Sequence, residues 1–180
     1  VYHPTYYENH INDVNTRKVI TVHDMIHEKL PRFFSPKDTT RQIKKQAVSK
    51  ADGIIAVSES TKRDLIEILD VPEEKIKVIY HGCSLSMRKN YISTHIKFPF
   101  ILYVGSRNGY KNFKLLLEAF ARSTNIKNNY KLLCFGGGSF SKEEVFLIKK
   151  YKIEDKVVQI SGNDDLLADL YRQAAVFVYP

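Results

Sequence analysis

The sequence predicts an α/β protein made of parts of two domains, each with a parallel sheet. Two observations carry this prediction. Short β-branched and apolar runs alternate with segments of helical periodicity along almost the whole chain of 180 residues. Repeated strand–helix–strand units of this kind are typical of parallel sheets with helices on both faces. One stretch, residues 81–97, contains neither a clear strand nor a long helical face and indicates a connector between the two domains.

The individual elements follow from periodicity and turn residues. Strands are predicted at Lys18–His23, Gly53–Val57, Ile76–Tyr80, Phe100–Val104, Lys131–Phe135, Lys156–Ile160 and Val176–Tyr179. Helices are predicted at Arg41–Lys50, Glu59–Leu69, Asn112–Ser123, Lys142–Lys152 and Asp165–Ala174. Ser141 is followed three residues later by Glu144, the pattern of a capping box, which indicates a helix start at this point.

The break in the alternation divides the chain into residues 1–85, a connector at 86–97, and residues 98–180. Both α/β pieces are at the low end of domain size. The first opens with a tyrosine-rich segment without an initiator Met, and the second stops at Pro180, directly after a predicted strand. We therefore expect an internal part of a longer protein, truncated at both ends.

The composition excludes several classes of protein. Apolar residues make up 43% and charged residues 27% of the chain, which is typical of a globular protein and not of a disordered one. No apolar run reaches the roughly 18 residues of a membrane-spanning helix, and the first residues lack the pattern of a signal peptide. Cys83 and Cys134 are far apart in the sequence. A disulfide scaffold or zinc site is therefore not expected, and a reducing cytoplasm fits the sequence.

The net charge is +8, and basic residues are densest between Arg32 and Lys50, where the only acidic residue is Asp38. Three interpretations stay open: contact with anionic lipid headgroups, binding of nucleic acid, or the solvated face of a lysine-rich helix. Nucleic acid is the least supported of the three, because no recognised binding motif accompanies the charge.

Three loops follow predicted strands at the edge where parallel sheets bind ligands. His23 and Asp24 end one strand, the segment 105–111 follows another, and Gly136–Gly138 follows a third. In 105–111, glycines permit close backbone approach and two cations precede a helix N-terminus, which together favour a diphosphate site. The alternatives are a solvated surface turn, a flexible glycine turn and a structural histidine, and the spacing alone does not exclude them.

Other catalytic patterns are absent from the sequence. The chain contains no Asp-x-Asp pair and no G-x-S-x-G nucleophile elbow. The six histidines are scattered, and His23 with His27 would share a helical face only where a strand end is predicted. We therefore predict no metal site.

The motifs taken together resemble a known family. The segments TVHDMIHEKLP, KADGIIAVSESTKRDLIEIL, VPEEKIKVIYHG, ILYVGSRNGYKNFKLLLEAF, CFGGGS and LADLYRQAAVFVYP resemble, in this order, a family 4 glycosyltransferase. The resemblance implies the GT-B architecture: two Rossmann-like domains around a cleft, retaining chemistry and no metal or other cofactor. The form RNGYKNF further resembles bacterial enzymes that build surface polysaccharide, many of them mannosyltransferases.

The resemblance also implies roles for individual residues. Lys111 corresponds to the lysine on the donor diphosphate, and Arg107 lies near its partner arginine. Gly105 is followed by Ser106, where many members have arginine. His23 matches the histidine that contacts the transferred sugar. Glycines of two further loops match the nucleotide pocket: Gly136, Gly137 and Gly138 in FGGGS, and Gly162 after the strand that meets the base.

Two family segments are not found in this sequence: the E-x7-E motif expected after Pro180 and the glycine-rich acceptor loop. The resemblance thus predicts part of an enzyme that moves a hexose, with mannose the first candidate, from a nucleotide-sugar donor to a glycan or lipid-linked acceptor. The truncated chain alone is expected to be inactive. Cytoplasmic location is expected, with peripheral contact to an anionic inner membrane suggested by the basic stretch. The alternative is an inactive homologue that binds a nucleotide or a partner protein.

Overall fold

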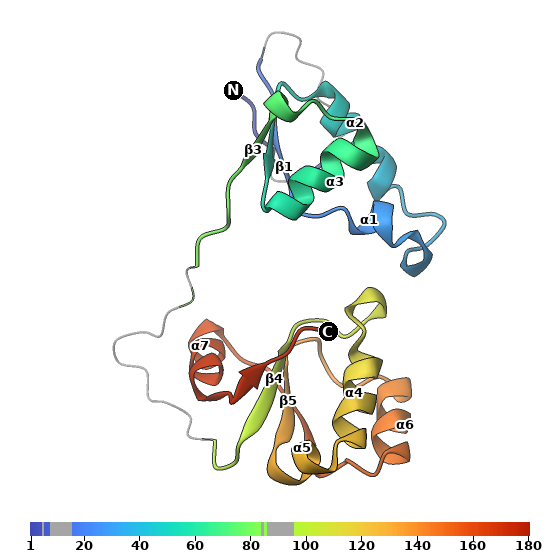
Figure 1. Cartoon of the computed structure of the whole chain (residues 1–180), viewed down its shortest axis with the longest axis vertical. Coiled ribbons are helices and arrows are strands. Elements are labelled where there is room, and N and C mark those ends of the chain that lie inside the picture. The colour runs from blue at the N-terminus through green and yellow to red at the C-terminus, as the bar shows by residue number, and fades with distance from the viewer. Residues whose placement is uncertain (5, 8–15, 84, 86–95) are drawn as a thin grey trace. The chain divides into compact units, whose positions relative to one another are not determined.

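The computed structural model describes every residue except 5, 8–15, 84 and 86–95. The chain divides into two compact units, Val1–Cys83 and Ser84–Pro180, called here the first and second unit (Figure 1). Each unit contains its own parallel sheet and its own apolar core. Most of the predicted connector at 86–97 lies outside the described residues.

The first unit contains a three-stranded parallel sheet in the order β1-β2-β3. Its strands are β1 (Val19–Val22), β2 (Gly53–Ala56) and β3 (Ile76–Val78), and its helices are α1 (Ile26–Lys29), α2 (Thr40–Lys50) and α3 (Glu59–Leu69). In β1 and β2 alternate residues are buried, and these pack against Val48 of α2 and Leu65 of α3. Both long helices therefore cover the same face of this sheet.

The second unit contains a four-stranded parallel sheet in the order β6-β5-β4-β7. Its strands are β4 (Phe100–Val104), β5 (Lys131–Phe135), β6 (Val157–Ile160) and β7 (Val176–Phe177). Its helices are α4 (Phe113–Arg122), α5 (Thr124–Asn129), α6 (Lys142–Lys150) and α7 (Asp164–Gln173). The central strands β4 and β5 are buried on both faces, as their uninterrupted apolar sequences require.

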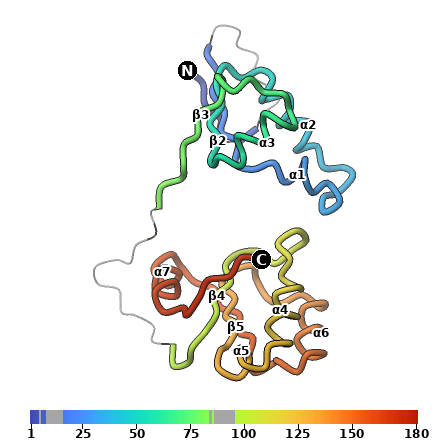
Figure 2. The backbone as a smooth tube through the Cα atoms, viewed as in Figure 1, coloured from blue at the N-terminus to red at the C-terminus, as the bar shows by residue number. Residues whose placement is uncertain are grey.

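The two faces of the second sheet carry separate cores. One core joins Leu132 to Leu117 of α4 and Ile148 of α6, and the other joins Leu133 to Leu170 of α7. The second unit therefore has three layers, with α4 and α6 on one side of the sheet and α7 on the other (Figures 1 and 2). Cys134 lies inside the first of these cores, and burial raises the pKa of its thiol to about 12.

The α/β class and the parallel strand order confirm the predicted fold. All seven predicted strands are present, and the ends of several are shorter by one or two residues. The capping box at Ser141 and Glu144 is also present. The sequence did not predict α1 and α5, nor the short 3-10 turns Pro31–Phe33, Glu73–Lys75 and Gly109–Lys111. These segments are too short to show an apolar periodicity.

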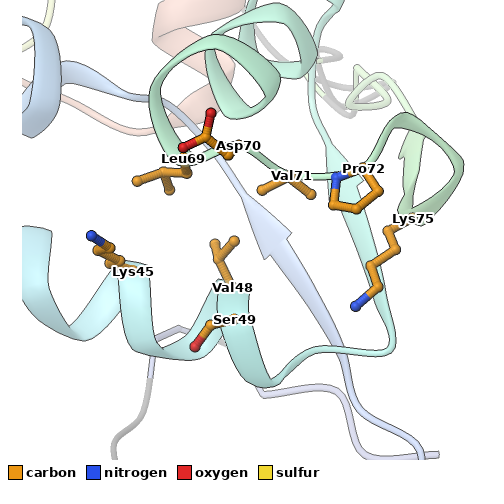
Figure 3. A pocket seen from close by; sticks show the side chains of 8 residues that line it. All are labelled: Lys45, Val48, Ser49, Leu69, Asp70, Val71, Pro72 and Lys75. Carbon is orange, nitrogen blue, oxygen red and sulfur yellow. The ribbon is translucent and has the colours of Figure 1, made fainter.

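One pocket of the first unit lies away from the predicted ligand edge. It has a volume of about 220 Å³ and is lined by Lys45, Val48, Ser49, Leu69, Asp70, Val71, Pro72 and Lys75. These residues come from the ends of α2 and α3 and the turn before β3, which lie at the amino ends of the strands. Figure 3 shows Lys45 and Lys75 on opposite sides of this pocket.

In the part of the chain that the structure describes, no helix is both long enough and apolar enough to cross a membrane.

Candidate functional site

Two of the predicted loops meet at the carboxyl edge of the second sheet. They are the 105–111 loop after β4 and the Gly136–Ser139 segment after β5, here called the glycine loop. Because β4 and β5 are neighbouring parallel strands, both loops leave the sheet at the same edge. The Gly105 amide donates to the Phe135 carbonyl at 2.9 Å. The sequence prediction that both loops serve one site is consistent with this geometry.

Lys111 lies in the 105–111 loop next to Gly105. A Cβ built on Gly105 would lie 3.8 Å from the Lys111 ammonium, so the cation lies directly over this glycine. The ammonium also lies 5.1 Å from the centre of the Tyr179 ring. A hydrogen bond with the Tyr179 hydroxyl raises the pKa of Lys111 above its ordinary value. Lys111 therefore carries its positive charge at neutral pH and at every pH below that.

The helix that follows Lys111 begins without a side-chain cap. Asn112, at its N-cap, has a left-handed backbone with φ 52°, and its side chain accepts no hydrogen bond from the first turn. The other long helices of the second unit, α6 and α7, are capped by Ser141 and Asn163. The Leu115 amide donates to the Asn112 carbonyl at 3.0 Å, and no side chain caps the two amides before it. These two amides, with the positive end of the helix dipole, suit an anion.

Arg107 is directed into the protein and not toward solvent. Its side chain is only 2% exposed, and its Nε donates to Glu144 Oε1 at 2.9 Å. Its Nη1 donates to the Gly136 carbonyl at 2.9 Å, and its Nη2 lies between 2.9 and 3.4 Å from the next three carbonyl oxygens, those of Gly137, Gly138 and Ser139.

This position differs from the sequence prediction, in which Arg107 contacts a diphosphate. The guanidinium carries five N–H groups in a fixed fork, and here the carbonyl oxygens of the glycine loop and one carboxylate occupy its three nitrogens. Arg107 therefore binds, from inside the protein, the glycine loop that was expected to line the nucleotide pocket.

Ser106 and Gly162 complete the predicted set in the second unit. Ser106 is exposed, and its carbonyl accepts a 2.5 Å hydrogen bond from the buried Tyr103 hydroxyl. Burial raises the pKa of Tyr103 to about 12, so the phenol remains a donor across the neutral range. Gly162 follows β6, and a Cβ there would come within 2.5 Å of Leu166 Cδ2, so this turn leaves little room for a side chain.

In the first unit, His23 follows β1 at the carboxyl edge. Its ring stacks on His81, with ring centroids 5.4 Å apart and planes 15° from parallel. His81 was not predicted as a site residue. Its position shortly after β3 could have indicated that it lies near His23, because β3 ends at the same edge of the sheet as β1.

The segment after His23 is held by a buried lysine. Lys44 of α2 is 1% exposed, and its ammonium donates to the Asp24 carbonyl at 2.9 Å and to Glu28 Oε2 at 2.8 Å. Lys44 belongs to the basic stretch between Arg32 and Lys50, for which the sequence predicted solvent-exposed or ligand-binding cations. Its spacing from Ala47 and Val48, both buried on α2, was the available signal that it faces inward.

A pocket of about 340 Å³ opens beside Asp24 at this edge, lined by Asp24, Met25, Ile26, Lys29, Leu30, Ser58, Ser60, Thr61 and Asp64. Most of its polar groups bind one another. The Ser58 hydroxyl caps α3, Lys29 pairs with Asp64 at 2.7 Å, and Asp24 accepts from the Ile26 amide. In the described part of the chain, no three histidine, cysteine, aspartate or glutamate residues group as ligands for a metal.

Comparison with known families decides the class of protein. Residues 89–180, about half of the chain, match the family model "Glycosyl transferases group 1", and residues 10–86 match "Glycosyltransferase Family 4". The chain belongs to the family 4 glycosyltransferases. The two models meet near the division between the two units of this glycosyltransferase.

Among the relatives of this glycosyltransferase is a Campylobacter jejuni enzyme, N-acetylgalactosamine-N,N'-diacetylbacillosaminyl-diphospho-undecaprenol 4-alpha-N-acetylgalactosaminyltransferase. It is 32% identical over 118 residues, which cover 64% of this chain and 32% of the relative. The O-antigen chain mannosyltransferase RfbU of Salmonella typhimurium is 27% identical over 168 residues, covering 91% of this chain and 45% of the relative. The chain spans between 32% and 50% of the length of the four curated relatives it matches.

Solved structures agree with the GT-B fold of this glycosyltransferase. WaaG, a glycosyltransferase involved in lipopolysaccharide biosynthesis, matches with a TM-score of 0.70 and 19% identity over 90% of this chain and 50% of its own. TarM of S. aureus, solved with UDP, matches with a TM-score of 0.60 and 16% identity over 85% of this chain and 30% of its own. At these identities the likeness shows the fold alone.

Proposed function

We propose that the protein is a retaining glycosyltransferase that moves a hexose from a nucleoside-diphosphate sugar to a hydroxyl of a glycan or lipid-linked acceptor. Family membership supports the reaction class. The Salmonella and Escherichia coli relatives are both O-antigen chain mannosyltransferases, which supports surface polysaccharide as the product and mannose as the first candidate sugar. The proposal is for the whole protein, of which this chain carries the loops described above.

The observation that carries the proposal is the place of Lys111 beside the uncapped start of α4. In glycosyl transfer the bond between the sugar and the diphosphate breaks, and negative charge grows on the leaving diphosphate. A fixed ammonium and helix N–H groups without a side-chain cap stabilise that charge more in the transition state than in the ground state. In this proposal the diphosphate binds over Gly105, between the Lys111 ammonium and the first turn of α4.

His23 is proposed as the residue that contacts the transferred sugar. Its ring is exposed at the carboxyl edge of the first sheet, and stacking on His81 limits the orientations available to it. The role assigned to His23 is to hold the sugar in a reactive geometry. No metal is assigned a role, because Lys111 and the helix N-terminus supply the positive charge in this proposal.

Binding of a nucleoside diphosphate to the Lys111→Ala variant tests the assignment. GDP and UDP are titrated by calorimetry in the presence of EDTA, and wild-type protein is expected to bind at least one of them. Lys111→Ala is expected to weaken that binding by about tenfold or more, the usual scale for a charge-assisted contact. The matched control is Lys149→Ala, which removes an equal charge from the exposed last turn of α6.

Several outcomes would contradict parts of the proposal. Equal affinities for the Lys111→Ala and Lys149→Ala variants would remove Lys111 from the site. Loss of wild-type binding in EDTA alone would show that a metal is required. Nucleotide binding without sugar transfer to any glycan or polyprenyl-linked acceptor would favour the alternative of an inactive, nucleotide-binding homologue.

Contact with an anionic membrane is proposed as the way the protein meets a lipid-linked acceptor at the cytoplasmic face. Exposed cations on α2, namely Arg41, Lys45 and Lys50, support it. Lys44 does not contribute, because its ammonium is buried against Glu28. Anionic headgroups attract such exposed basic residues by roughly 1 kcal/mol each at low salt.

A further inference from the structure

The glycine loop has an unusual backbone. Gly136, Gly137 and Gly138 have φ values of +78°, +69° and +72°, so all three are in the left-handed region. The carbonyl oxygens of this loop require a donor where they are buried.

Arg107 is that donor. Its guanidinium reaches the carbonyl oxygens of all three glycines and of Ser139, with three of the four distances at 3.0 Å or less. The packing is close, since a Cβ on Gly137 would lie 2.6 Å from the Gly105 carbonyl oxygen and 2.7 Å from Arg107 Nη1. One side chain thus joins the 105–111 loop to the whole glycine loop.

Glu144 balances the buried charge and fixes the guanidinium. Its Oε1 accepts from Arg107 Nε at 2.9 Å, and its Oε2 accepts from the Ser141 amide at 2.6 Å in the capping box of α6. The carboxylate is therefore held by a helix start and in turn orients Arg107. The ring of Phe140 lies 4.8 Å from the guanidinium carbon and completes the enclosure.

The opposite side of the glycine loop faces outward. Gly137 and Gly138 are exposed, and within the described residues their N–H groups donate to no protein acceptor, whereas the Gly136 amide donates to the Ile160 carbonyl at 3.0 Å. The carbonyl groups are thus occupied from inside, and the two free amides are presented at the edge where Lys111 lies. Successive backbone amides in such turns form concavities that bind anions.

We propose that Arg107 and Glu144 are positioning residues for donor binding: the pair holds the glycine loop so that the Gly137 and Gly138 amides meet a nucleoside diphosphate. Arg107 does not itself contact the phosphates. The inference rests on the proposed function, because it takes the nucleotide as the ligand of this edge. It assigns to Glu144 a role in nucleotide binding, whereas the sequence indicated only a helix cap for this residue.

The test compares four forms of the protein: wild type, Arg107→Lys, Glu144→Gln and the double variant Arg107→Met with Glu144→Leu. An ammonium cannot reach four carbonyl oxygens and a carboxylate at once, so the Arg107→Lys variant is expected to bind GDP or UDP about tenfold more weakly or worse. The Glu144→Gln variant is expected to show a similar loss, although this residue lies behind the guanidinium. Donor KM should rise in both variants more than kcat falls.

The double variant separates binding from folding. Replacement of a buried ion pair by apolar residues of similar volume is often neutral for stability. Because the Arg107→Met change also leaves the loop carbonyl oxygens without their donor, the double variant is expected to remain folded with a lower thermal midpoint than wild type, while its nucleotide affinity is about tenfold reduced or lower. Order parameters from ¹⁵N relaxation of Gly136–Gly138 in the free protein should fall in this variant and remain unchanged in Lys111→Ala.

The outcomes distinguish the two proposals. A folded double variant with wild-type affinity would overturn the positioning role. So would a Glu144→Gln variant with wild-type affinity beside a strongly weakened Arg107→Lys variant, because that pattern indicates direct contact of Arg107 with the phosphates. If wild-type protein binds neither GDP nor UDP, the proposed function fails, and the positioning role fails with it.

Discussion

At the scale of single residues, Gly137 and Gly138 share a left-handed backbone but differ in their surroundings. A Cβ on Gly137 would collide with the Gly105 carbonyl and the Arg107 guanidinium, whereas a Cβ on Gly138 would find no atom within 4 Å. The backbone cost of alanine is the same at both positions, and only Gly137 adds a steric cost. The pair therefore separates backbone strain from packing at adjacent positions.

The Gly138→Ala variant is expected to lose about 1–2 kcal/mol of the free energy of unfolding, the cost of a left-handed backbone for an L-residue. The Gly137→Ala variant is expected to lose a further 1–3 kcal/mol or so from overpacking against Gly105 and Arg107. Denaturant unfolding followed by circular dichroism measures both. Equal losses in the two variants would show that the two loops are not in close contact.

Arg107 also shows where residue-level reasoning from the sequence reaches its limit. In the sequence, Arg107 directly follows Ser106 in a loop that precedes a helix. The simplest interpretation was that its side chain contacts a ligand at the surface. The direction of the side chain depends on carbonyl oxygens of Gly136–Ser139, about thirty positions later in the chain. Periodicity within a loop carries no information on such a partner.

At the scale of elements, the short helix α1 is held in place by its neighbour α2. Lys44 of α2 binds Glu28 of α1 and the Asp24 carbonyl in the segment before it. Glu28 is itself buried, so both charges depend on this pair. A four-residue helix has little stability of its own, which explains why the sequence did not predict α1 while α2 and α3 were predicted nearly to the residue.

The Lys44→Met variant is expected to lose about 3–5 kcal/mol of the free energy of unfolding, because it leaves the Glu28 carboxylate buried without its cation. The Lys45→Met variant makes the same substitution at the adjacent, exposed position and is expected to change stability by less than about 0.5 kcal/mol. Urea unfolding compares the two variants. Similar midpoints for both would contradict the buried pair.

At the scale of the whole molecule, the alternation of strands and helices was enough to predict two parallel sheets. It could be recognised because apolar residues recur with a different spacing in strands than in helices. The convergence of the 105–111 loop and the glycine loop was also predictable, because neighbouring parallel strands end at one edge. The contacts of Lys44 with Glu28, of His81 with His23 and of Glu144 with Arg107 were not predicted, because each joins two different elements.

Membrane contact is a property of the molecular surface and is tested at this scale. We expect the protein to float with vesicles that contain anionic phosphatidylglycerol at low salt, to be released at about 0.5 M salt, and not to float with neutral vesicles. The double variant Arg41→Glu with Lys45→Glu should lose this binding. Its control, Lys149→Glu with Lys150→Glu on α6, makes an equal charge change and should retain it. Equal loss in both would indicate unspecific attraction by net charge.

The burial of Cys134 has a practical consequence. Its thiol lies in the core of the second unit with a pKa raised to about 12, so at neutral pH almost none of it is the reactive thiolate. Cys83 is exposed at the end of the first unit. The folded chain therefore offers maleimide dyes one accessible thiol, and a fluorophore or spin label can be attached next to the division between the units without removal of a native residue.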